Sequence, residues 1–81
     1  MKKVAAIEDL SGYGRASLTV AIPILSSMGY QVCPLPTAIL SAHSEYKNFR
    51  SIDLTPHMSG IIDHWKELGL YFDAICSGYL A

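Results

Sequence analysis

Hydrophobic residues along the chain fall first into a strand-like run and then into a helix-like pattern. The continuous apolar character of Lys3 to Leu10 is typical of a strand buried on both faces of a parallel sheet. Within Ser17 to Met28 the apolar residues recur at helical spacing, and Gly29 supplies a natural stop. Because Pro23 lacks a backbone N–H, we expect this helix to begin near Thr19, which keeps the proline close to the first turn.

A second strand candidate runs from Gln31 to Leu40. Its Pro34 and Pro36 cannot donate to a neighbouring strand, which favours an edge position or an interrupted strand. The polar stretch Lys47 to Asp53 is expected to be a surface connection.

The remaining third of the chain predicts one more helix and one more strand. Thr55 as N-cap and Pro56 at the first helical position mark a helix start, and Gly69 marks its end. Phe72 to Ser77 is expected to form a third buried strand. The helix carries one apolar stripe, made of Met58, Ile61, Ile62, Trp65 and Leu68.

The order strand, helix, strand, helix, strand predicts an α/β fold with a parallel sheet and two right-handed crossovers. The chain has 81 residues, of which 51% are hydrophobic and 16% are charged. Small soluble domains usually have about 25% charged residues, so the excess apolar surface must meet a partner chain or a C-terminal continuation. Since Ala74 to Ala81 reads as a buried strand running into a turn, we expect residues 1–81 to be the truncated N-terminal part of a single domain.

Charge and cysteine content exclude several classes of protein. The net charge is −1 with no basic stripe, which argues against a nucleic-acid partner. No apolar run approaches the roughly 20 residues of a transmembrane helix, and the start of the chain does not resemble a signal peptide. Cys33 and Cys76 are far apart and fit no metal spacing. We therefore expect no membrane partner, no metal site, and two free thiols in a cytoplasmic protein.

Candidate binding residues follow each predicted strand. The segments Asp9 to Arg15, Ser41 to Tyr46 and Ser77 to Tyr79 should meet at one edge of the sheet, where open α/β sheets bind ligands. Gly12 and Gly14 allow positive φ and close ligand approach. The polar side chains of the three segments suit a small polar ring or a sugar: Asp9, Ser11, His43, Ser44, Glu45 and Tyr79.

Each of these residues also has a purely structural explanation. A lone aspartate after a strand more often caps the following turn, and a lone histidine is more often hydrogen-bonded than catalytic. Tyr79 could pack, and Tyr46 is expected to do so. The cluster is stronger evidence than any member because three separate strand ends supply it.

The turn Gly12-Tyr13-Gly14 suggests a dinucleotide site, but the fingerprint is incomplete. Ser17 stands where a third glycine is needed, and Glu45 comes too late for the acid after the second strand. The sequence contains no P-loop and no Gly-x-Ser-x-Gly nucleophile elbow.

Three stretches of this sequence resemble the N-terminal portion of pyridoxal/pyridoxamine kinases of the ribokinase-like superfamily. They are Ile7 to Arg15, Cys33 to Thr37 with Ser41 to Ser44, and Phe72 to Leu80, and the resemblance covers essentially all 81 residues. It implies a three-layer α/β sandwich enzyme, a homodimer at full length. Such an enzyme transfers the γ-phosphate of ATP to the hydroxymethyl group of a pyridine ring, as in vitamin B6 salvage.

The same resemblance implies roles for individual residues. Asp9 matches the position that hydrogen-bonds the ring, Ser44 and Glu45 would border the substrate, and Tyr79 corresponds to an aromatic beside the pocket. Many relatives have serine where Asp9 stands, and glycine or glutamine where Glu45 stands, which bears on specificity.

The resemblance assigns no catalytic, cofactor-binding or metal-binding residue to this chain. In the family, the Gly-x-Gly-Asp anion hole, the catalytic base and the residues that bind ATP and Mg²⁺ lie in the C-terminal half. We therefore expect this polypeptide alone to be inactive, since base catalysis and charge neutralisation supply most of phosphoryl transfer.

Three other functions stay open at this point. The nearest is a hydroxymethylpyrimidine/phosphomethylpyrimidine kinase of thiamine synthesis, which the same segments fit. A dinucleotide-binding oxidoreductase fragment is suggested by Gly12 and Gly14 alone. A non-catalytic interaction module, complete at Ala81, would be a stable oligomer without a pocket at the strand ends.

Overall fold

The computed structural model describes residues 1–14 and 16–78, which form four strands and two helices. Their order along the chain is β1 (Lys3–Ser11), α1 (Leu18–Ser27), β2 (Gln31–Leu40), β3 (Ser51–Asp53), α2 (Thr55–Glu67) and β4 (Ala74–Ser77). Neither helix of this part of the chain is long and apolar enough to cross a membrane.

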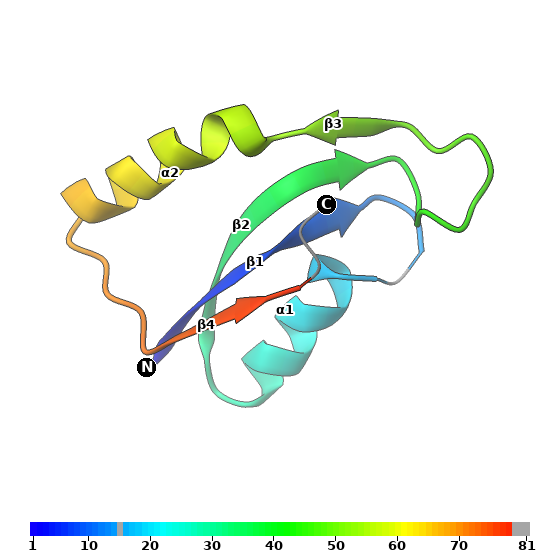
Figure 1. Ribbon diagram of the computed structural model, residues 1–81. Helices are drawn as coiled ribbons and strands as arrows, with labels where there is room; N and C mark the ends of the chain where they lie inside the picture. The colour runs from blue at the N-terminus through cyan, green and yellow to red at the C-terminus, as the bar shows by residue number, and fades with distance from the viewer. Residues whose placement is uncertain (15, 79–81) are drawn as a thin grey trace.

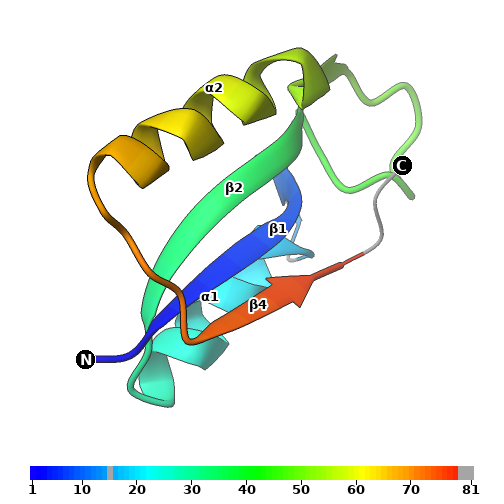
Figure 2. The same ribbon diagram turned by 60° about the vertical axis from the view of Figure 1, so that its left-hand side comes forward.

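The four strands form one sheet in the order β3-β2-β1-β4 (Figure 1). β1 lies inside the sheet and is parallel to both of its neighbours, β2 and β4. The chain leaves β1 toward β2 through α1, and later passes back to β4 on the other side of β1 through α2. Right-handed crossovers in opposite directions place the two helices on opposite faces of the sheet, as Figures 1 and 2 show. The carboxyl end of β1 is therefore a topological switch point, where α/β sheets bind ligands.

The first helix agrees with the predicted span but not with the predicted place of its proline. α1 begins at Leu18, so Pro23 lies in the second turn rather than close to the first. Its ring is at an exposed position, away from the sheet. Gly29 follows the helix with a φ of 91°, as expected of a residue that ends a helix.

The sheet is mixed rather than purely parallel because β3 pairs antiparallel with β2. The predicted surface connection Lys47 to Asp53 thus contains a short strand. β3 pairs with Ala38–Leu40, beyond Pro34 and Pro36, so the proline-containing part of β2 has only β1 as a described neighbour. The prolines therefore keep their predicted edge position on one side of the strand.

The start of α2 differs in detail from the prediction. The N-cap residue is Leu54, not Thr55, and Pro56 lies in the first turn. The Asp53 carboxylate accepts a hydrogen bond of 2.9 Å from the Thr55 N–H, so an aspartate at the end of β3 satisfies the first amide of the helix. At the other end, Gly69 has a φ of 71° and ends the helix as predicted.

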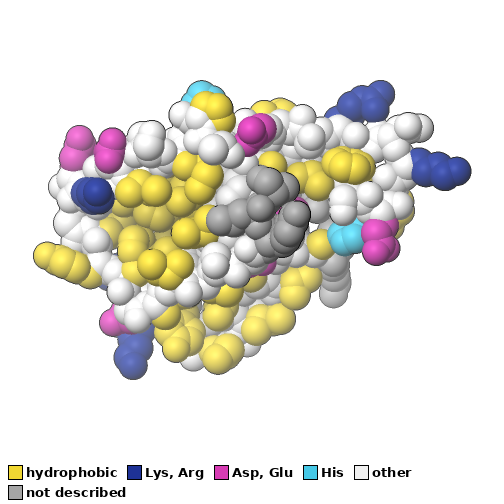
Figure 3. All heavy atoms as spheres, viewed as in Figure 1, with side chains coloured by type: hydrophobic (Ala, Val, Ile, Leu, Met, Phe, Trp, Pro, Cys, Tyr) yellow, Lys and Arg dark blue, Asp and Glu magenta, His cyan; other side chains and the backbone are white. Residues whose placement is uncertain are grey.

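Few side chains are fully buried. Ile75 in β4 is 69% exposed, so β4 is an uncovered strand rather than the buried one that was predicted. Figure 3 shows hydrophobic side chains gathered between α2 and β4. This is the excess of apolar surface that the composition predicts. The buried apolar residues are Val4, Ala5, Ala6, Leu18 and Leu35.

We predict that Leu35→Ala destabilises the protein by about 2–5 kcal/mol, because it removes a core side chain and leaves a cavity. Leu35 is 1% exposed, whereas Leu68 is 60% exposed, so Leu68→Ala makes the same chemical change outside the core. Urea unfolding of both variants measures the difference. Equal losses of unfolding free energy would contradict the assignment of Leu35 to the core.

Candidate functional site

The loops that follow β1 and β2 are joined into one unit. The Gly12 N–H donates to the Leu40 carbonyl at 2.8 Å, and the His43 N–H donates to the Tyr13 carbonyl at 2.8 Å. The Tyr13 and Tyr46 rings pack with their centroids 5.3 Å apart, so Tyr46 packs as expected. The carboxyl ends of two parallel strands therefore act as a single platform.

Two glycines make this junction possible. Gly14 has a φ of 90°, and a Cβ at this position would lie 3.1 Å from the His43 Cβ. At Gly12 the backbone of the other loop comes close: a Cβ added at this position would lie 3.2 Å from the Ser41 carbonyl oxygen. Glycine is required here by loop-to-loop contact within the protein.

The pairing of β1 with β2 is irregular where the strands reach the site. Glu8 pairs with Pro36 and Leu10 with Ile39, so two steps along β1 correspond to three along β2. Such a bulge re-aims side chains and is common beside binding sites. The extra residue falls opposite Asp9, at the edge of a cavity.

This cavity has a volume of about 470 Å³ and brings together predicted residues from two strand ends. Asp9 comes from β1, and Ser44 comes from the loop after β2. Small-molecule sites usually have about 300–1,000 Å³, so one pyridine-sized ring fits. The cavity is lined by Asp9, Thr37, Ala38, Leu40, Ser44, Phe49, Ser51 and Asp53.

The Asp9 side chain is hydrogen-bonded to a residue outside β1. Its Oδ1 accepts a hydrogen bond of 2.6 Å from the Ser17 hydroxyl, and both side chains are partly buried. Asp9 thus contacts the segment before α1 through a hydroxyl rather than through the backbone amide that a turn cap would use.

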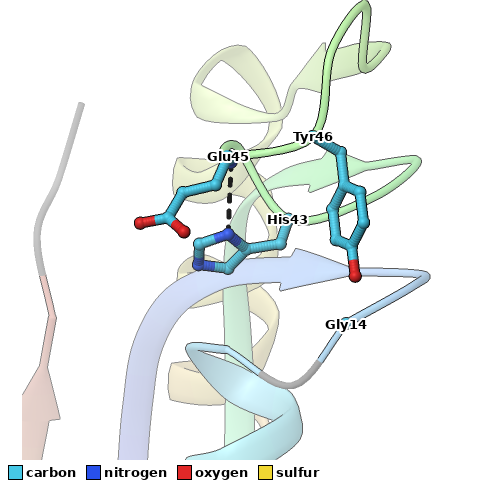
Figure 4. Close-up of a pocket in the computed structure, with 4 residues that line it drawn as sticks. All are labelled: Gly14, His43, Glu45 and Tyr46. Atoms are coloured by element: carbon cyan, nitrogen blue, oxygen red, sulfur yellow. Dashed lines mark hydrogen bonds between the residues drawn. The ribbon is translucent and has the colours of Figure 1, made fainter.

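A second cavity, of about 390 Å³, is lined by Gly14, His43, Glu45 and Tyr46 (Figure 4). The His43 Nδ1 accepts a hydrogen bond of 3.2 Å from the Glu45 N–H, which leaves the proton of the neutral ring on Nε2. The predicted hydrogen-bonded state of His43 is therefore present. Figure 4 shows the His43 ring and the Glu45 carboxylate on one side of the loop and the Tyr46 ring on the other.

The structure does not place every predicted residue at a cavity. Ser11 is only 3% exposed and lines neither cavity, although its hydroxyl has no hydrogen-bond partner within residues 1–14 and 16–78. Tyr79 lies outside the described residues, so its predicted place beside the pocket stays a prediction.

Glu8 lines neither cavity, but its side chain has an unusual environment that the sequence does not single out. Its Oε2 is buried without a partner in the described part of the chain, and its Oε1 would lie 2.5 Å from a Cβ added to Gly78. The signal in the sequence was an acid at the end of an apolar strand. Burial of an unpaired carboxyl oxygen costs free energy, so the place where β1 and β4 meet holds a polar group that folding alone does not explain.

The glycine turn is not arranged as a phosphate cradle. The Gly12 amide is already bonded to Leu40, and two amides later in the first turn of α1, Val20 and Ala21 N–H, donate to the Ser17 carbonyl at 3.0 and 2.8 Å. These contacts argue against the dinucleotide hypothesis. Within the described residues, no group of three or more His, Cys, Asp or Glu side chains could hold a metal ion.

Asp53, at the rim of the first cavity, has an altered acidity. A hydrogen bond from the Thr55 side chain, reinforced by the Thr55 backbone N–H, lowers the pKa of Asp53 below its ordinary value. Because Asp53 is exposed, the lowered pKa comes from its hydrogen bonds with Thr55 and not from burial.

Known structures share this fold closely. A candidate phosphomethylpyrimidine kinase from Bacteroides thetaiotaomicron, crystallised in a form with pyridoxal, is 64% identical over 98% of this chain, with a TM-score of 0.94. Pyridoxal kinase from Lactobacillus plantarum is 37% identical over 99% of the chain, with a TM-score of 0.92.

The chain has the fold of the N-terminal part of pyridoxal kinases. It spans 28% of the Bacteroides protein and 29% of the Lactobacillus kinase. Pyridoxal kinase from Leishmania donovani, in complex with ADP and pyridoxine, has the same fold at 20% identity, with a TM-score of 0.90 over 96% of this chain. No protein-family model and no curated protein sequence matches the chain at a significant level. The predicted resemblance to these kinases and the predicted fold class are confirmed.

We predict that Gly14→Ala costs more stability than Gly29→Ala. Both glycines have a φ near 90°, at 90° and 91°, but nothing lies within 4 Å of a Cβ at Gly29. Both variants therefore carry the same backbone strain, of about 1–2 kcal/mol, and only Gly14→Ala also displaces His43. Urea unfolding and the ¹⁵N amide shift of His43 measure the two effects. Equal destabilisation with an unmoved His43 amide would contradict the loop junction.

The acidity of Asp53 gives a prediction about pH. Because its pKa is lowered in the folded state, the associated stability is present above the ordinary aspartate value, about 4, and is lost as the pH falls through the folded value. Thr55→Val should move the pKa of Asp53 upward, and Thr55→Ser should keep it low. Carboxyl ¹³C NMR titration measures both. An unchanged titration in Thr55→Val would mean that the hydroxyl has no such role.

Proposed function

We propose that this chain is the substrate-side part of an ATP-dependent kinase that phosphorylates the hydroxymethyl group of pyridoxal, pyridoxamine or pyridoxine. The observation that carries the proposal is the cavity in which Asp9 and Ser44 meet at the carboxyl ends of β1 and β2. The proposal is also supported by the Bacteroides protein, which is 64% identical to this chain and was crystallised with pyridoxal.

The cavity offers a different contact to each part of a pyridine alcohol. The Asp9 carboxylate accepts hydrogen bonds from a ring N–H or O–H, and the Ser44 hydroxyl both donates and accepts. Leu40 and Phe49 supply apolar wall against the ring faces. His43 and Glu45, on the same loop as Ser44, border the ligand on the side of the second cavity.

Phosphoryl transfer needs groups that the described residues lack. No Gly-x-Gly-Asp sequence occurs among the 81 residues. ATP and Mg²⁺ would supply the phosphoryl group and its charge neutralisation, and we propose that they are bound mainly by chain outside this segment. The 81-residue polypeptide alone is then inactive. The cytoplasmic location and the homodimeric state of the full-length enzyme remain predictions, as does the role of Tyr79.

A second candidate is the phosphorylation of a hydroxymethylpyrimidine. It is favoured by the name of the Bacteroides protein, a candidate phosphomethylpyrimidine kinase. Turnover of pyridoxine and of hydroxymethylpyrimidine by the natural gene product separates the two functions: a preference for the pyrimidine would replace the first proposal by the second.

We predict that the protein binds pyridoxine through Asp9 and Ser44. Asp9→Asn should weaken binding about tenfold and Ser44→Ala about fivefold, as losses of one charged and one neutral hydrogen bond. Ser59→Ala, at an exposed position in α2, makes the same change as Ser44→Ala outside the cavity.

Calorimetric titration measures these affinities, and pyridoxine is preferred to pyridoxal because it has no aldehyde to react with lysines. Pyridoxine binding that neither Asp9→Asn nor Ser44→Ala weakens more than Ser59→Ala does would place the ligand elsewhere. Absence of binding to the unsubstituted protein would end the proposal.

A further inference from the structure

We infer that Ser17 is a positioning residue, whose hydroxyl fixes the Asp9 carboxylate as a hydrogen-bond acceptor at the ligand cavity. The cavity would then take ligands that present an N–H or O–H donor to Asp9. The inference deepens the proposed function and rests on it, because it names the residue through which Asp9 is oriented.

The contact between the two side chains is short and has one direction. The Ser17 Oγ lies 2.6 Å from the Asp9 Oδ1, the length of a hydroxyl bonded to a carboxylate. A serine hydroxyl has one hydrogen, and here it is donated to Oδ1. A carboxylate has only acceptor oxygens, and Asp9 is among the residues that line the cavity, so its second oxygen is a further acceptor.

Ser17 does not use its hydroxyl as its position in the chain would suggest. It is the N-cap residue of α1, where a serine oxygen normally accepts a hydrogen bond from an amide of the first turn. No such side-chain capping bond is made. The hydroxyl instead reaches Asp9, which lies eight residues earlier in the chain.

The backbone of Ser17 is strained, and its surroundings hold it there. Its φ of 53° and ψ of −122° lie in a region that residues other than glycine rarely occupy. Ser17 is bridged to Leu10 at the end of β1, and its carbonyl accepts from Val20 and Ala21 at the start of α1. Glycine would adopt this conformation more easily, but it has no hydroxyl. We take the hydroxyl as the reason for serine at this position.

The test compares Ser17→Ala and Ser17→Gly by titration with pyridoxine. Both remove the hydroxyl, but the glycine variant also relieves the strain and should be at least as stable in urea as the unsubstituted protein. If Ser17 positions Asp9, both variants bind pyridoxine roughly 5–10-fold more weakly.

Thr19→Ala is the matched control. The Thr19 hydroxyl bonds to Ala16 at 2.9 and 2.7 Å in the same turn, and Asp9 is not its partner. This variant should bind pyridoxine as the unsubstituted protein does. In an Asp9→Asn background, Ser17→Ala should have no further effect, because the group that it positions has been changed.

Several results would overturn the inference. Full affinity in Ser17→Gly would show that the backbone matters and the hydroxyl does not. Equal weakening in Thr19→Ala would point to general loosening of the turn. Weak binding in Asp9→Asn with full affinity in both Ser17 variants would reject this inference and keep the proposed function, whereas no pyridoxine binding by the unsubstituted protein would reject both.

Discussion

The hydrogen-bonded junction between the loops after β1 and β2 is the constraint on which the site depends. Parallel pairing brings the carboxyl ends of the two strands to the same edge, but pairing alone would leave two independent loops. The bonds from Gly12 to Leu40 and from His43 to Tyr13 turn them into one surface. Asp9 and Ser44 then lie on a shared wall, although they are far apart in the chain.

The longer helices and strands could be predicted because each depends mainly on its own residues. The apolar run of β1 and the terminal glycines Gly29 and Gly69 are local signals, and the structure bears them out. β3 could not be predicted in this way, since three exposed residues have no periodicity and acquire strand geometry only by pairing with β2. Likewise, the amide at the start of α2 is satisfied by Asp53, a choice that depends on where β3 ends.

The candidate site could also be predicted only in part. The sequence indicates which loops meet, because parallel strands share an edge. It does not indicate the bulge opposite Asp9, the strained Ser17 or the unpaired carboxyl oxygen of Glu8, since each arises from contacts between segments. In the proposed function, the described residues supply binding and orientation. Interactions that hold substrate and transition state equally do not accelerate a reaction, so the catalytic power of such a kinase must lie in other groups.

Amide chemical shifts during addition of pyridoxine test the central claim most directly, because they locate the ligand without relying on activity. The account predicts that the ¹H–¹⁵N signals of Asp9, Thr37 and Ser44 move together with one affinity. Those of Gly29 and Gly69, which follow the two helices and precede β2 and β4, should stay in place. Shifts at the glycines with unmoved signals for Asp9 and Ser44 would contradict a ligand site at the joined carboxyl ends of the strands.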